Sequence, residues 1–162
     1  MYCFPFLDQR VVIARGIRIL SLKFHRLHAY MFMSFSPFFK ECKNYQILSS
    51  ADRKVTHGSS PRLCDNNLGP GWFRFLGAAG MKMPTWCIPA GRCGTHIPGW
   101  LNGTHPEEYE GNVTRQACFH CETSCCRYFH DIQVRNCSGY YVYYLRKTIC
   151  HARYCGTLLI GE

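Results

Sequence analysis

The chain has 162 residues, enough for one hydrophobic core and an appendage. Its 12 cysteines are about 7% of the residues, close to the level of disulfide-stapled domains, and its formal net charge is +9 at pH 7. No run of five basic residues occurs, so the charge leaves no footprint for nucleic acid and we expect no such partner.

The first 39 residues differ in composition from the rest of the chain, because apolar and basic residues alternate there. Three arginines (Arg10, Arg15 and Arg18) interrupt the apolar core that a secretory signal needs, and the longest uncharged run, 27–39, is too short to span a bilayer. We therefore predict that residues 1–39 are a leader outside the folded domain, either a poor signal peptide or a mis-translated segment. We expect no membrane span.

The next part of the chain, residues 40–156, reads as one domain, followed by a short tail at 157–162. Residues 44–61 are polar and loop-like, and glycines and prolines break up the middle of the domain, so no long helix fits there. Short β-strand patterns occur at 71–77, 113–119, 132–136 and 140–145. The sequence predicts a small β-rich, disulfide-stapled domain with short antiparallel strands, long loops and little helix.

Seven of the cysteines fall between Cys118 and Cys155. Adjacent Cys125 and Cys126 cannot easily bond to each other, so they are expected to reach different partners. A zinc site with nearby His130 or His151 is the rival interpretation, but zinc sites favour two separated C-x-x-C knuckles and only one is present, at 118–121. We therefore expect disulfides, no metal and no cofactor.

Three glycosylation sequons accompany these cysteines, at Asn102, Asn112 and Asn136. Six Asn and 17 Ser plus Thr would give about 0.6 sequons by chance. Sequons and disulfides together favour an extracellular, secreted glycoprotein. Asn136 is the least favourable of the three, because its middle residue, Cys137, should be bridged.

Enzymatic function has weak candidates only. Cys121 with His120 or His130 could form a nucleophile–base pair, but a spare thiol among ten bridged cysteines is more often incidental. The acidic residues Glu107, Glu108 and Glu110 crowd one segment and read as a solvated loop rather than as the paired acids of a glycosidase. We expect no enzyme.

An exposed aromatic face is the remaining candidate site. In a regular strand over 140–145, Tyr140 and Tyr144 point away from Tyr141 and Tyr143. If Tyr140 and Tyr144 face solvent, they could hold a carbohydrate or a protein, although aromatic side chains more often fill a small core.

The chain from Cys42 to Cys155, about 114 residues, resembles the cysteine-rich module of uromodulin and the major pancreatic zymogen granule membrane glycoprotein. The motifs that carry the resemblance are Glu-Cys-Lys-Asn-Tyr at 41–45, Gly-Trp-Phe-Arg-Phe at 71–75, Trp-Leu-Asn-Gly-Thr-His-Pro at 100–106, Arg-Gln-Ala-Cys at 115–118, Cys-Cys at 125–126, Gln-Val-Arg-Asn-Cys at 133–137, Tyr-Tyr-Val-Tyr at 140–143 and Tyr-Cys at 154–155.

Ten cysteines could pair in many ways, and the residues alone do not choose among them. The resemblance implies five disulfides: Cys42–Cys137, Cys64–Cys150, Cys87–Cys125, Cys93–Cys155 and Cys118–Cys126. It leaves Cys121, where relatives usually carry an aromatic residue, and Cys3 in the leader. These two are expected to be unpaired, joined to each other, or, for Cys121, bonded to another molecule.

A second departure concerns a glycan. In relatives the strand at 143–146 carries a sequon whose glycan is implicated in presenting mannose to bacterial fimbrial adhesins, whereas Tyr144 and Arg146 stand at its positions here. That route does not transfer to this chain, although Asn102 keeps another sequon of the family. The resemblance implies a non-enzymatic extracellular module that presents N-glycans to glycan-binding or other extracellular proteins. The alternative is a lectin-like or matrix-binding module that uses the tyrosine face.

Overall fold

A computed structural model describes residues 39–158 of the protein. The predicted leader, apart from Phe39, lies outside the described residues, as does Cys3. Within the described part, no helix is long and apolar enough to cross a membrane.

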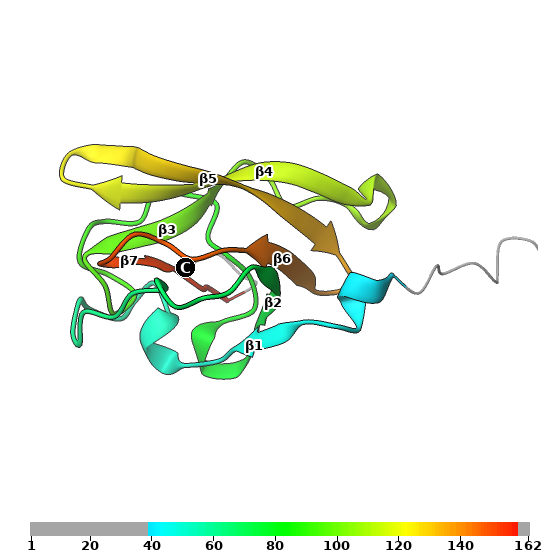
Figure 1. The fold of residues 1–162 in the computed structure, drawn as a ribbon, viewed down its shortest axis with the longest axis horizontal. Coiled ribbons are helices and arrows are strands. Elements are labelled where there is room, and N and C mark those ends of the chain that lie inside the picture. The colour runs from blue at the N-terminus through cyan, green and yellow to red at the C-terminus, as the bar shows by residue number, and fades with distance from the viewer. Residues whose placement is uncertain (1–38, 159–162) are drawn as a thin grey trace, which may run out of the picture. The chain divides into compact units, whose positions relative to one another are not determined.

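One seven-stranded sheet organises the described residues (Figure 1). Its spatial order is β1-β2-β6-β5-β4-β3-β7. The two outermost pairs, β1 with β2 and β3 with β7, are parallel, and the four pairs between them are antiparallel. The strands are β1 (Gln46–Leu48), β2 (Gly71–Phe75), β3 (Ile97–Asn102), β4 (Asn112–Cys121), β5 (Ser124–Asn136), β6 (Tyr141–Leu145) and β7 (Ala152–Tyr154).

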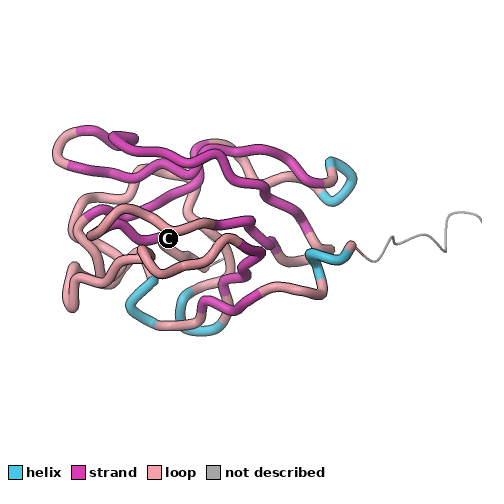
Figure 2. The backbone as a smooth tube through the Cα atoms, viewed as in Figure 1, coloured by secondary structure: helices cyan, strands magenta, loops and turns pink. Residues whose placement is uncertain are grey.

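Within residues 39–158, helix is limited to four single 3-10 turns, one before β1 and three in the connections, which Figure 2 shows as short segments. They are η1 (Lys40–Cys42), η2 (Ala51–Arg53), η3 (Gly77–Ala79) and η4 (Glu108–Glu110). In η4 the side chain of Glu110 accepts a hydrogen bond from the backbone N–H of Glu107 at 2.6 Å, as part of a capping box. The Glu110 carboxylate therefore closes a turn, which gives this residue a structural role.

The main core contains residues from all seven strands. Phe73 and Phe75 of β2 and Tyr143 and Leu145 of β6 point into it, because alternate residues of a strand share a face. Leu48 from one edge strand and Tyr154 from the other join the same cluster. Since opposite edges of the sheet supply one core, the sheet must curl around it.

The β-rich, disulfide-stapled, helix-poor fold is confirmed. The predicted strands at 71–77, 113–119, 132–136 and 140–145 correspond to β2, β4, β5 and β6, and β4 and β5 form a longer hairpin than expected. The prediction of a loop at 44–61 was wrong for the residues that form β1. The middle of the domain, which glycines and prolines interrupt, contains β3. The tail at 157–162 begins with Thr157, which is fully buried and bridges to Lys82.

Gly99, one of the residues in β3 that usually interrupt strands, is required at its position. Gly99 lies in β3 beside Phe119 of β4, and a Cβ at position 99 would meet the Phe119 ring at 2.6 Å. The missing side chain therefore makes room for an aromatic ring that belongs to the core.

Candidate functional site

Four disulfides cross-link the described residues: Cys42–Cys137, Cys87–Cys125, Cys93–Cys155 and Cys118–Cys126. These are four of the five pairs that the resemblance implies. Adjacent Cys125 and Cys126 reach different partners, on the loop before β3 and on β4 respectively. The framework thus ties the β4–β5 hairpin to the loop before β3 and links its two strands to each other.

The structure differs from expectation at the fifth pair. The Sγ atoms of Cys64 and Cys150 lie 3.9 Å apart, which is too far for a bond of about 2.0 Å. Cys64 is half-buried and Cys150 is exposed. Because rotation of an exposed side chain about Cα–Cβ moves its sulfur by a distance of this size, the Cys64–Cys150 disulfide stays a prediction.

Cys121 lies at the end of β4, opposite Ser124 across the β4–β5 turn. It is half-buried and unbonded. The two bases proposed for it are engaged elsewhere: His120 contacts the carbonyl of Ile88 at 2.6 Å, and His130 contacts the hydroxyl of Tyr154 at 3.0 Å. Each ring thus uses its Nδ1 in a contact that does not involve Cys121, and an intermolecular disulfide through Cys121 stays a prediction.

A metal-ligand geometry does occur in the described residues, at Cys87, His120 and Cys125. The two sulfurs of this group are bonded to each other. A thioether-like disulfide sulfur is not the thiolate that zinc needs, so only His120 is left as a ligand.

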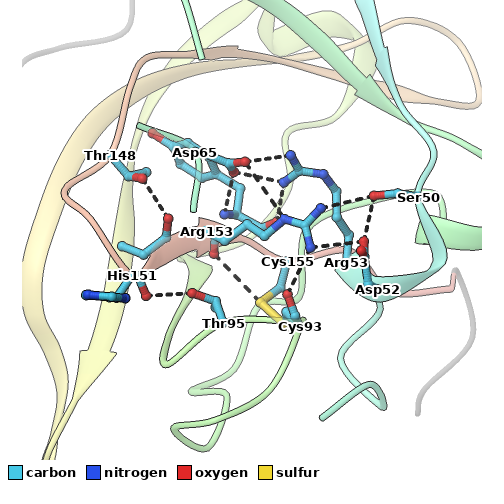
Figure 3. Close-up of polar contacts among 12 residues, drawn as sticks. Ser50, Asp52, Arg53, Asp65, Cys93, Thr95, Thr148, His151, Arg153 and Cys155 are labelled. Carbon is cyan, nitrogen blue, oxygen red and sulfur yellow. Dashed lines mark hydrogen bonds and ion pairs between the residues drawn. A yellow bond between two sulfur atoms is a disulfide. The ribbon is translucent and has the colours of Figure 1, made fainter. Parts of the chain in front are cut away.

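The cross-linked scaffold is organised around a buried ion network that the sequence did not reveal (Figure 3). Arg53 donates from Nη1 and Nη2 to the two carboxylate oxygens of Asp65 at 2.8 and 2.5 Å. The same carboxylate accepts from the backbone N–H of Tyr154 at 3.0 Å and lies 3.8 Å from Nε of Arg153. Arg53, Asp65 and Arg153 are each less than 8% exposed.

Arg153 extends the network toward the surface. Its guanidinium contacts Asp52 at 2.9 Å, Ser50 at 3.0 Å and the carbonyl of Cys93 at 3.3 Å. Burial opposes ionisation of Asp52, but the hydrogen bond from Ser50 and the charge of Arg153 outweigh it and lower the pKa of Asp52. The network joins η2, the Asp65 loop and β7. These three segments are far apart in sequence, and no periodic pattern of residues indicates that they meet.

The three sequons lie in different environments. Asn102, at the end of β3, and Asn112, at the start of β4, are exposed. Asn136 is half-buried: its side-chain nitrogen donates to the carbonyl of Pro106 at 3.1 Å, and the next residue, Cys137, is bridged to Cys42. A glycan at Asn136 would disturb the half-buried contact with Pro106. Asn102 and Asn112 contact Gln116 and Arg135, but both asparagines are exposed, so a glycan there meets less crowding.

The predicted tyrosine face is only partly presented to solvent. Tyr144 is 42% exposed and packs edge-on against Trp72, with ring centroids 5.6 Å apart. Tyr140 is half-buried beneath the guanidinium of Arg74, at 3.8 Å from its ring centroid, and its hydroxyl donates to the carbonyl of Cys42 at 2.6 Å. Tyr140 therefore has a scaffold contact, and Trp72 is the aromatic residue that accompanies Tyr144.

A depression of about 400 Å³ opens beside these aromatic residues. It is lined by Asn44, Tyr45, Gln46, Gly71 and Trp72. The parallel pairing of β1 with β2 brings the two segments together although they are far apart in the chain.

His105 anchors the loop that follows the Asn102 sequon. Its Nε2 lies 2.8 Å from the hydroxyl of Tyr143, which also accepts from the backbone N–H of Met83 at 3.0 Å. Burial, aided by the charges of Lys82 and Arg115, lowers the pKa of His105 to about 3. The neutral ring therefore accepts a hydrogen bond from the Tyr143 hydroxyl.

This arrangement predicts acid sensitivity. The unfolded chain binds a proton at His105 below pH 6.5, whereas the folded protein does not until about pH 3. The stabilisation is complete above pH 6.5 and is lost progressively as the pH falls, by about 2 kcal/mol at pH 5. Urea unfolding at pH 7 and pH 5 should show this loss in the wild type and a smaller loss in His105→Gln. The exposed His96→Gln provides the control, and equal losses in wild type and His105→Gln would contradict the assignment.

Comparisons with known proteins identify the family of this chain. The family model "Uromodulin-like, D8C domain" matches residues 73–156. The pancreatic secretory granule membrane major glycoprotein GP2 of Canis lupus familiaris is 42% identical over 116 residues, which cover 70% of this chain and 23% of that protein. The corresponding glycoprotein of Homo sapiens is 39% identical over 119 residues, covering 72% and 22%.

Uromodulin of Mus musculus is 41% identical over 116 residues, which cover 70% of this chain and 18% of uromodulin. The chain thus spans less than a quarter of the length of these curated relatives. The family resemblance is confirmed: this cysteine-rich, disulfide-stapled chain belongs to the uromodulin-like D8C domain family.

Proposed function

We propose that this domain is a non-enzymatic extracellular module that displays N-linked glycans on a rigid scaffold to glycan-binding proteins. The observation that supports it most directly is the placement of Asn102. This side chain is exposed at the end of β3, where the sheet and the disulfides fix the backbone. A glycan attached there would have a defined direction relative to the domain.

The backbone of the sequon is held as well as its asparagine. Arg115 of β4 donates from Nε to the carbonyl of Thr104 at 2.9 Å. The side-chain nitrogen of Asn102 lies 3.3 Å from Oε1 of Gln116, at the exposed edge of the β3–β4 pair. Neither contact buries the asparagine, so it is accessible to the glycosylation machinery. The matched relatives include proteins named as glycoproteins, which agrees with this proposal.

Removing the acceptor should remove the display. In secreted protein, Asn102→Gln and Thr104→Ala should each lower the mass by one N-glycan and abolish most binding of a mannose-specific adhesin or lectin. Thr104→Ser keeps the sequon and should restore both. Asn66→Gln, at an exposed asparagine outside any sequon, is the matched control. Undiminished mass and lectin binding in Thr104→Ala would refute display through Asn102.

A further inference from the structure

The depression between the start of β1 and the start of β2 has the chemistry of a carbohydrate site. It is lined by two amides, two aromatic rings and one glycine: Asn44, Gln46, Tyr45, Trp72 and Gly71. Its volume of about 400 Å³ falls within the range of small-molecule sites. We propose that this depression binds a neutral saccharide, so that the domain captures glycans in addition to displaying its own.

The two amides are available to a ligand. Both residues are exposed, and neither the Asn44 nor the Gln46 side chain is hydrogen-bonded to another residue within 39–158. An amide side chain has an acceptor oxygen and two N–H donors, which match the paired hydroxyl groups of a sugar ring. Gln46 lies over Gly71, where a Cβ would be 3.5 Å from its side-chain nitrogen.

The aromatic rings are already fixed in place. Arg74 donates from Nη1 to the hydroxyl of Tyr45 at 2.9 Å, and Arg74 itself stacks on Tyr140. On the other side, Trp72 packs edge-on against Tyr144, its directly paired neighbour on β6. Rings that are held before binding lose little conformational entropy when a ligand stacks on them. This low entropic cost favours ligand binding at an exposed site.

The charges of the lining select the class of sugar. The residues that line the depression are uncharged. The nearby cation, Arg74, already donates to Tyr45 and lies against the Tyr140 ring. An acidic saccharide would therefore find no free cation among the lining residues and would lose solvation of its carboxylate. Neutral hexoses and N-acetylhexosamines lack this cost and offer apolar ring faces to Tyr45 and Trp72.

The test uses the secreted full chain after enzymatic removal of its N-glycans, so that its own sugars do not compete. Methyl α-mannoside, methyl β-galactoside and methyl β-N-acetylglucosaminide are titrated separately, and saturation-transfer NMR and the Trp72 indole signal report binding. At least one of the three should bind at the depression. The variant Asn44→Ala/Gln46→Ala, which breaks no internal side-chain hydrogen bond, should bind it about tenfold more weakly.

Two controls make the result decisive. Asn67→Ala removes an exposed amide elsewhere, and Tyr109→Ala removes an aromatic ring that is 88% exposed, so both should bind as the wild type does. The proposal would be overturned if none of the three sugars bound, or if binding were unchanged in the double variant. It would also be overturned if the Trp72 signal responded only to a pool of tryptic peptides, titrated as a protein-like ligand. Because the glycans are absent, failure here is separate from failure of display through Asn102.

Discussion

Asp65→Ala should destabilise the domain by about 3–5 kcal/mol, because it leaves two buried guanidinium groups without their shared carboxylate. Asp65 accepts from Arg53 and from the backbone N–H of Tyr154, and its own backbone bonds to Ala152 and Thr148. The loss is comparable with the whole stability of a small domain, which is about 5–15 kcal/mol. Secretion yield and the urea midpoint should both fall sharply.

Two further variants identify the cause of this loss. Asp52→Ala removes a carboxylate from the same Arg153, but at a site where the Asp52 side chain is 24% exposed, so it should cost only about 1 kcal/mol. The double variant Arg53→Met/Asp65→Leu removes charges of both signs and should be less damaging than Asp65→Ala alone. If Asp65→Ala and Asp52→Ala cost the same, the buried network does not hold η2, the Asp65 loop and β7 together.

Removing the Cys42–Cys137 disulfide should be the second severe change. Its partners are 95 residues apart, and in the loop-entropy description such a link disfavours the unfolded chain by about 4–5 kcal/mol. Cys42→Ala/Cys137→Ala should lower the free energy of unfolding by about this amount. Both residues are only half-buried, so a packing defect adds little.

The Cys118–Cys126 disulfide offers a comparison that closes a short loop, and Cys118, unlike Cys42 and Cys137, is fully buried. Its partners are only 8 residues apart, and the same description gives about 2–3 kcal/mol. Urea unfolding of the two double-alanine variants should therefore rank the long link above the short one. The reverse order would show that native-state packing, rather than restriction of the unfolded chain, sets the value of these bonds.

Other contacts around Cys42 can hold η1 in place when its disulfide is removed. Arg135 lies 3.2 Å from Glu41 and its guanidinium is 3.0 Å from the Phe39 ring centroid. Tyr140 also donates to the carbonyl of Cys42. These contacts are local to the folded state, so they can orient η1 but cannot replace the entropic effect of the covalent link.

The strands that the sequence predicted are those with an uninterrupted pattern. β6 is continuously aromatic or aliphatic, and the end of β5 alternates Ile132 and Val134 with polar residues. β1 and β7 have three residues each, too few for a period to show, and β3 contains Pro98 and Gly99. Their strand character depends on neighbours supplied by the rest of the sheet, which no local pattern records.

The candidate sites divide in the same way. The sequons at Asn102 and Asn112 are local motifs, so the sequence could identify them. The depression lined by Asn44 and Trp72 exists only because β1 and β2 run side by side, and Asp65 meets Tyr154 across 89 residues. The binding face at Tyr140 and Tyr144 stays a prediction, and the stacking of Arg74 on Tyr140 is a contact that no periodicity in the sequence indicates.

The brevity of the two outermost strands has a consequence for behaviour in crowded solution. β1 and β7 each expose a border of only three residues, and β7 is followed at once by buried residues that bridge to Lys54 and Lys82. A foreign polypeptide that needs a long row of free amide and carbonyl groups to zip onto finds almost none at these borders. The shortness of the two outermost strands therefore protects these two borders from the addition of a foreign strand.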